Sequence, residues 1–355
     1  MKRLAVWSTA LVLVALAATA AWLAYRAHAD GEPPAATGDV LFVTNRHMNE
    51  AAEPENRFDG RRGELVQGRC RVGYRPIPLT RDLARSVAFF VPTDFQSVEA
   101  VEMLDDPTFD AALQSRPGVP VVLFVHGYSY GFDKTCRMGA DLQRMLGNGA
   151  TVVMFSWPSD ANPADYAADQ VDVEWSVPAL AGLIERLATR AGGGPLRVLA
   201  HSLGTRGVLF ALAWLDLAGM PPPYAEHLVL LAPDYDAAAF AQQFDGIDRR
   251  VGRVTLYASA NDTPLKLSET LHGYPRLGQA SEALTVIEGM ETIDVSPLGR
   301  YRFSGHEYFF YHPIAADDLV ESLIHARPPG ERRHTEARST NGDRYWVLVE
   351  PESEP

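Results

Sequence analysis

From Gly118 onward the chain alternates short, continuous apolar runs with longer segments of helical periodicity. Unbroken apolar runs are typical of strands buried on both faces, and their alternation with helices indicates a parallel sheet covered on both sides. We expect strands at 120–126, 150–157, 196–201, 227–233, 253–259 and within 284–295, and helices over Asp133–Leu146, within Asp165–Arg190, over Leu203–Leu217 and after Asp236. The pattern predicts an α/β fold with a mostly parallel, doubly wound sheet.

The region before Gly118 has a different pattern. Three β-like stretches, 40–46, 65–74 and 86–92, are separated by charged and turn-rich segments, which predicts antiparallel strands. The tail from Arg327 is polar, but Asn341-Gly342 lies between two β-like runs and predicts a terminal hairpin. We therefore expect one domain over 39–326, with an N-terminal β extension (39–117) and a catalytic core (118–326), followed by a polar tail (327–355).

The first 29 residues differ in kind from the rest. Lys2 and Arg3 precede an apolar run from Leu4 to Ala24, and Ala27-His28-Ala29 has the small residues of a signal-peptidase site. The run is long enough to span a bilayer, so a cleaved signal peptide and a retained anchor both stay open. Either one exports the remainder, to the periplasm or to the periplasmic face of the inner membrane, after a linker over 30–38.

Composition narrows the class of protein. The chain has 355 residues, 46% apolar and 22% charged, with a formal net charge of −13, which argues for a globular protein and against nucleic-acid or anionic-membrane binding. We expect contact with a membrane only through an N-terminal anchor. Cys70 and Cys136 have no metal-ligand spacing, so we expect no metal and no cofactor. They form either a disulfide or two buried thiols, and the sequence also leaves the oligomeric state open.

Two serines match the pattern of a hydrolase nucleophile. GYSYG, centred on Ser129, fits G-x-S-x-G literally, whereas AHSLG, centred on Ser202, has alanine first. A nucleophile elbow joins the end of a strand directly to the start of a helix. Ser202 follows RVLAH and precedes a continuous helical pattern, but the first helix N-cap after Ser129 is Asp133, four residues away. The context therefore favours Ser202 as nucleophile and places Ser129 on a loop.

The loop around Ser129 has another expected role. In α/β hydrolases the loop after the first strand of the parallel series supplies one oxyanion donor, and the N–H after the nucleophile supplies the other. These donors would be the backbone N–H groups of Tyr128, or a close neighbour, and of Leu203. Gly127 would let the backbone approach the substrate, and His126 would support the loop by a hydrogen bond.

The acid and the base should follow the nucleophile in the order Ser, acid, His. Asp262 follows the second strand after that of Ser202 and is the expected acid; Asp234, one strand earlier, is the alternative, and Asp294 is a third candidate. His306 lies after the last strand and is the expected base, with His312 as the fallback. Two other histidines are not expected to be the base, because His201 directly precedes Ser202 and His272 lies between the acid and the last strand.

These motifs carry a family resemblance. Residues 40 to about 315 resemble a bacterial α/β-hydrolase family of unknown function, through LFVTNR, FVHGYSYGF, VMFSWPS, LAHSLGTR, LAPDYD, LYASANDTPLKLS with RLG after it, TIDVS and GHEYF. The resemblance implies a triad of Ser202, Asp262 and His306 and an oxyanion loop at HGY. The family pattern has asparagine after HGY, where this chain has Ser129.

We expect an exported serine hydrolase that cleaves an ester or a related acyl bond of a small molecule through an acyl-enzyme. Segment 158–176 would shape the rim of the pocket, where its acidic side chains either disfavour anionic substrates or form a solvated helix face. Two other functions stay open: a non-catalytic envelope protein that binds a partner on a hydrolase fold, and a serine peptidase or amidase.

Overall fold

The computed structural model describes residues 34–76, 94–190, 193–280, 282, 284–300, 304–340 and 342–350. The predicted leader (1–29) and the predicted strand at 86–92 lie outside these residues. Within the described ranges, no helix is both long and apolar enough to cross a membrane.

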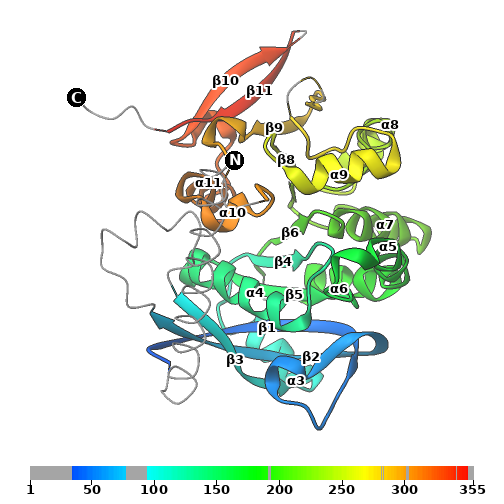
Figure 1. Ribbon diagram of the computed structural model, residues 1–355, viewed down its shortest axis with the longest axis vertical. Coiled ribbons are helices and arrows are strands. Elements are labelled where there is room, and N and C mark those ends of the chain that lie inside the picture. Colours follow the sequence, from blue (N-terminus) through cyan, green and yellow to red (C-terminus); the bar gives the residue numbers. More distant parts are fainter. Residues whose placement is uncertain are drawn as a thin grey trace, which may run out of the picture.

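The centre of the molecule is a parallel sheet. Its six strands are β4 (Val121–Val125), β5 (Thr151–Ser156), β6 (Leu196–His201), β7 (His227–Leu231), β8 (Val254–Ala258) and β9 (Met290–Asp294). All six lie within the predicted strand segments, because continuous apolar runs of this length bury both faces. The full order is β10-β11-β9-β8-β7-β6-β4-β5-β1-β2-β3 (Figure 1). The mixed, mostly parallel sheet with antiparallel N-terminal strands confirms the predicted fold class.

The N-terminal strands extend this sheet at one end. They are β1 (Ala36–Met48), β2 (Phe58–Pro76) and β3 (Asp94–Met103). β1 pairs in parallel with β5 and antiparallel with β2, so the N-terminal region continues the main sheet. Two expectations need correction: β1 begins at Ala36, inside the predicted linker, and β3 was not predicted, because its alternating polar residues carry little apolar signal.

Helices cover both faces of the sheet. One face is packed by α3 (Asp106–Leu113), α5 (Tyr166–Trp175), α6 (Val177–Arg190), α7 (Gly204–Leu217) and α8 (Ala237–Asp248). The other is packed by α4 (Phe132–Leu146), α10 (Tyr308–Tyr311) and α11 (Pro313–Leu323), and α9 (Thr263–His272) follows β8. Single turns of 3₁₀ helix occur at Pro54–Asn56, Gly147–Gly149, Pro163–Asp165, Ser296–Leu298 and Pro329–Glu331.

The single helix expected within 165–190 is in fact two. The break falls at Ser176, whose hydroxyl donates a hydrogen bond to the Asp172 carbonyl, and Pro178 follows in the first turn of α6. Proline lacks an N–H and is tolerated in a first turn but not in a helix interior. The helical periodicity therefore continues across a break that the proline marks.

The C-terminal segment is part of the sheet. β10 (Thr335–Thr340) and β11 (Asp343–Leu348) pair antiparallel on either side of the predicted turn, and β11 also pairs in parallel with β9. Before the hairpin, the buried Arg332 forms ion pairs with Asp318 and Glu291. At the opposite end, a disulfide joins Cys70 on β2 to Cys136 on α4, with a Cα–Cα distance of 6.0 Å.

Candidate active site

Ser202 lies at the turn that joins β6 to α7. The strand ends at His201 and the helix begins at Gly204. The φ angle of Ser202 is +52°, a left-handed conformation that is uncommon for a residue with a Cβ and is often found at functional sites. At Gly204, a Cβ would lie 2.4 Å from the His126 carbonyl oxygen, so only glycine fits there. The turn has the geometry of a nucleophile elbow.

Asp262 and His306 form a buried pair at the same edge of the sheet. Asp262 follows β8 and caps α9: its Oδ1 accepts a hydrogen bond from the Leu265 N–H at 2.9 Å. Its Oδ2 is 2.6 Å from His306 Nδ1. Because one carboxylate oxygen is held by the helix N-terminus, the other is fixed toward the imidazole. Burial lowers the pKa of His306, but the adjacent carboxylate outweighs it and leaves that pKa above its ordinary value.

The His306 ring lies beside the Ser202 turn. The ring of His201, which directly precedes Ser202, is 4.7 Å from the His306 ring between centroids. His306 Nε2 has no hydrogen-bond partner among the described residues. The structure thus leaves free the nitrogen that a base would use, while the other nitrogen is held by Asp262.

The alternative acids are engaged elsewhere. Asp234 accepts hydrogen bonds from Tyr166 and Ser268, each at 2.6 Å, and forms an ion pair with the buried Arg276 at 2.7 Å. Asp294 accepts hydrogen bonds from the backbone N–H and the hydroxyl of Ser296. Neither carboxylate has a hydrogen bond to a histidine in the described structure.

The other histidines have separate contacts. His312 caps α11 by accepting a hydrogen bond from the Ile314 N–H at 3.3 Å. His272 lies 3.0 Å from the side-chain nitrogen of Gln170. His126 Nδ1 is 2.7 Å from the Gly127 carbonyl oxygen, and burial lowers the pKa of His126 well below its ordinary value, so the neutral ring donates this bond. This is the supporting hydrogen bond expected from the sequence.

The loop after β4 lies against the Ser202 turn. A Cβ at Gly127 would be 2.9 Å from the Ser202 Cβ, so the backbone passes the serine closely. The backbone N–H groups of Tyr128 and Leu203 donate no hydrogen bond to any described residue. Ser129, at φ +58°, instead donates its N–H to Asp169 Oδ2 at 2.9 Å.

A small cavity opens beside Ser202. Its volume is about 40 Å³, and α9 and the loop before α5 form much of its wall. The residues around it are Tyr128, Pro163, Tyr166, Ser202, Asp234, Pro264, Leu265, Leu267, Ser268 and Leu271. Pro163 and Tyr166 come from segment 158–176, which therefore contributes to the rim. Asp169 of that segment is fully buried, so the expectation of a solvated helix face is wrong for this residue.

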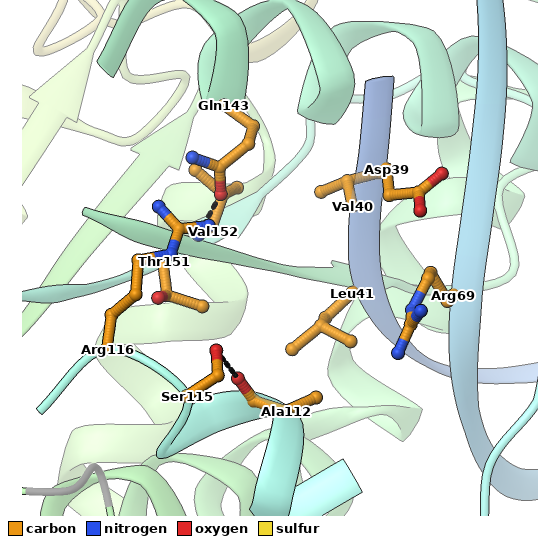
Figure 2. Close-up of a pocket in the computed structure, with 10 residues that line it drawn as sticks. All are labelled: Asp39, Val40, Leu41, Arg69, Ala112, Ser115, Arg116, Gln143, Thr151 and Val152. Carbon is orange, nitrogen blue, oxygen red and sulfur yellow. Dashed lines mark hydrogen bonds between the residues drawn. The ribbon is translucent and has the colours of Figure 1, made fainter. Parts of the chain in front are cut away.

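A larger cleft of about 260 Å³ lies elsewhere (Figure 2). Thr151 and Val152, where β5 begins, line it together with Asp39 and Arg69 of the N-terminal strands. Ligands of open α/β sheets bind at the carboxyl ends of the strands, where Ser202 and Asp262 lie, and this cleft is at the amino ends. We therefore place the active site at the smaller cavity. The described residues contain no group of three or more His, Cys, Asp or Glu side chains arranged to hold a metal.

The contacts of three buried polar residues near the site were not predicted from the sequence. Arg46 at the end of β1 and Asp169 on α5 contact the loop after β4, and the His201 ring packs between Tyr130, His306 and Phe309. For Arg46, the sequence did contain a signal: a charged residue at the end of an apolar strand. No local pattern marks Asp169, because its neighbours in sequence include exposed acids.

The fold, the elbow and the Asp262–His306 pair define the class of α/β hydrolases. The family described as alpha/beta hydrolase of unknown function (DUF900) matches residues 104–327, more than half of the chain, so the chain belongs to that family. This confirms the resemblance seen in the sequence.

Individual relatives are distant. An uncharacterized protein of Nostoc sp. is 24% identical over 160 residues, 38% of this chain and 42% of that protein, so the matched part spans less than half of the relative's length. A thioesterase of the prodiginine pathway in Streptomyces coelicolor has a TM-score of 0.33 and 14% identity, over 60% of this chain and 92% of its own. A serine hydrolase without a lid from Xanthomonas campestris has a TM-score of 0.33 and 16% identity, over 83% of this chain and 95% of its own.

Proposed function

We propose that the protein is a serine hydrolase that cleaves an ester or a related acyl bond. Ser202 Oγ attacks the carbonyl carbon while His306 Nε2 takes the hydroxyl proton, and Asp262 holds the imidazole in the required tautomer. The backbone N–H groups of Tyr128 and Leu203 stabilise the oxyanion. His306 then gives the proton to the leaving alcohol, and a water molecule, deprotonated by the same nitrogen, hydrolyses the acyl-enzyme and restores Ser202.

One observation carries the proposal. The Asp262–His306 hydrogen bond of 2.6 Å lies beside a serine with φ +52° between a strand and a helix. The carboxylate holds Nδ1, and Nε2 is left without a partner beside the serine turn, which is the arrangement that a Ser-His-Asp triad requires. The missing Ser202–His306 hydrogen bond does not oppose the assignment, because catalytic hydrogen bonds often tighten only when substrate binds.

The walls of the cavity favour a neutral, aliphatic substrate. Leu267 and Leu271 lie one turn apart on α9, are 58% and 64% exposed, and border the cavity. The Asp234 carboxylate is neutralised by Arg276, and the Tyr166 hydroxyl is engaged by Asp234. The free surface near Ser202 is therefore mostly apolar.

Export is part of the proposal. The N-terminal segment is either a cleavable signal or an anchor, and both place the hydrolase domain outside the cytoplasm. The Cys70–Cys136 disulfide supports this location, since disulfides persist in oxidising compartments.

A fluorophosphonate probe, which phosphonylates activated serines, tests the proposal. The folded full-length protein should be labelled, and Ser202→Ala should not be. Labelling that is absent from the wild type, or unchanged in Ser202→Ala, would refute the catalytic assignment. A panel of p-nitrophenyl esters of increasing acyl length, set against peptide substrates, then separates an esterase from a peptidase or amidase.

A further inference from the structure

Two buried charged residues, Arg46 and Asp169, form hydrogen bonds with the loop after β4. Arg46 is 1% exposed and donates a hydrogen bond to the Tyr130 carbonyl oxygen, and Asp169 is fully buried and accepts one from the Ser129 N–H. Taking a charge out of water is costly, and apolar residues of similar volume often stabilise a fold equally well. Stability alone therefore does not explain why these two charges are buried, and the backbone atoms that they bind indicate another role.

Asp169 connects the loop after β4 to the segment after β5 through its two carboxylate oxygens. Oδ2 accepts the Ser129 N–H at 2.9 Å and the Ser159 hydroxyl at 2.5 Å, and Oδ1 accepts the Asp160 N–H at 3.0 Å. The ionised carboxylate has enough lone pairs to accept all three bonds. Burial raises the pKa of Asp169, while these hydrogen bonds and the nearby Arg46 charge oppose that rise. The hydrogen bond from the Ser129 N–H to Asp169 thus fixes the backbone immediately after Tyr128.

Arg46 holds the next residue. Its Nη2 donates to the Tyr130 carbonyl oxygen at 2.6 Å, and its Nη1 donates to the Ser159 carbonyl oxygen at 2.8 Å. Burial lowers the pKa of Arg46 to about 10, so the guanidinium keeps its charge at neutral pH. Ser159 connects the two charged residues, because its carbonyl oxygen accepts from Arg46 and its hydroxyl donates to Asp169. The same hydroxyl accepts the Tyr130 N–H at 3.1 Å.

The loop is also held before Tyr128. The indole N–H of Trp157 donates to the His126 carbonyl oxygen at 2.9 Å. Backbone groups on both sides of Tyr128 are therefore fixed by hydrogen bonds, while the Tyr128 N–H donates none to the described residues. This is the arrangement that a rigid oxyanion donor requires, since a donor is effective only if it does not have to reorient during the reaction.

We infer that Asp169 and Arg46, linked by Ser159, are positioning residues that hold the Tyr128 N–H in place to stabilise the oxyanion made by attack from Ser202. The inference rests on the proposed function. It also explains why a residue with a Cβ occurs at φ +58° beside the nucleophile: the Asp169 hydrogen bond to the Ser129 N–H holds that conformation.

The Asp169→Asn variant tests the inference, because the side chain keeps its shape but replaces one acceptor oxygen with a donor. Either the Ser129 N–H or the Asp160 N–H then faces an NH₂ group. Loss of one oxyanion donor typically lowers kcat by 10²–10³, so we expect kcat on p-nitrophenyl butyrate to fall about 100-fold while KM changes little. Affinity for a trifluoromethyl ketone, which forms a tetrahedral adduct on the serine, should fall by a similar factor.

The matched control is Asp318→Asn. Asp318 on α11 is also buried and accepts hydrogen bonds from Tyr257 and Arg332, neither of which belongs to the loop after β4. This variant should lower the melting temperature and leave kcat and the ketone affinity at the wild-type values. A purely structural role for Asp169 would give the same result for both variants.

If Asp169→Asn does not fold, Ser159→Ala decides, because it removes only the hydroxyl between Asp169 and Tyr130. We expect it to lower kcat about 10-fold, a partial displacement of the donor. Wild-type kcat and ketone affinity in the folded Asp169→Asn, or in Ser159→Ala where the first does not fold, would overturn the inference. An inactive, unlabelled wild type would instead refute the proposed function, so the two failures are distinguishable.

Discussion

The turn after β6 and the loop after β4 look alike in the backbone and differ in what their serines contact. Ser202 and Ser129 have φ angles of +52° and +58°, and each follows a buried parallel strand. Ser202 is followed at once by α7, and the ring of its neighbour His201 lies against His306. The N–H of Ser129 is bound by Asp169, and α4 begins only at Phe132. The φ angles alone therefore do not separate the two serines, and the surrounding contacts are the basis for proposing Ser202 as the nucleophile and the Ser129 loop as the oxyanion loop.

The largest effect should come from removing the hydroxyl group of Ser202, and removal of the Ser129 hydroxyl is the matched comparison. Loss of the nucleophile of a serine hydrolase lowers kcat by about 10⁶, so Ser202→Ala should abolish ester turnover. Ser129→Ala keeps the backbone N–H that Asp169 binds and should stay within a few-fold of the wild type. Initial rates on p-nitrophenyl butyrate measure both. Inactive Ser129→Ala beside active Ser202→Ala would reverse the comparison.

The next effect concerns the acid. Asp262→Asn should lower kcat about 10⁴-fold, because an amide no longer holds the imidazole in the tautomer that accepts the serine proton. Asp234→Asn should act mainly on substrate binding and stability, since Asp234 contacts Arg276, Tyr166 and Ser268. If Asp234→Asn abolished turnover and Asp262→Asn did not, Asp234 would be the acid.

The pH dependence sharpens the same assignment. His306 must be neutral to accept a proton, and the Asp262 carboxylate raises its pKa above the ordinary value of 6.5. The acidic limb of kcat/KM should therefore have an apparent pKa above 6.5. In Asp262→Asn the largest raising charge is gone, while burial and the weaker effects of Glu307 and Asp234 remain, so the limb should move to lower pH. Rates of fluorophosphonate labelling from pH 5 to 9 measure this apparent pKa even in slow variants. An apparent pKa that is the same in Asp262→Asn and the wild type would contradict the pairing of Asp262 with His306.

The smallest effect on catalysis should come from the disulfide. Cys136 lies on α4, the helix that follows the Ser129 loop, and its bond to Cys70 closes 66 positions of chain. Opening a disulfide of this span typically costs about 2–4 kcal/mol of unfolding free energy. The double variant Cys70→Ala, Cys136→Ala should lose about that much in urea unfolding, with kcat unchanged. Complete alkylation of both wild-type cysteines without reductant would show that the bond does not form.

Much of the fold was predictable because buried parallel strands are short, continuous apolar runs, and six of them could be placed from the sequence. The prediction failed where the pattern was weak or continued across a break: β3 alternates with polar residues, and α5 and α6 share one periodicity. α9 was also missed, although Asp262 and Pro264 are typical of a helix start.

The candidate site was less accessible to sequence reasoning. Chain order and strand ends were enough to select Asp262 and His306, which the structure places 2.6 Å apart between Oδ2 and Nδ1. Their catalytic roles, and that of Ser202, stay predictions. The contacts of Asp169 could not be predicted, because its partner Ser129 is 40 positions away and the fold alone brings the two together.

The most direct test of the account is to find which serine carries the acyl group. A p-nitrophenyl ester mixed with the full-length protein and quenched in acid after one turnover traps the acyl-enzyme, and peptide mapping by mass spectrometry locates it. The account predicts a single acyl group on the peptide that contains Ser202. An acyl group on the peptide that contains Ser129, or turnover of the ester with no acylated serine, would contradict it.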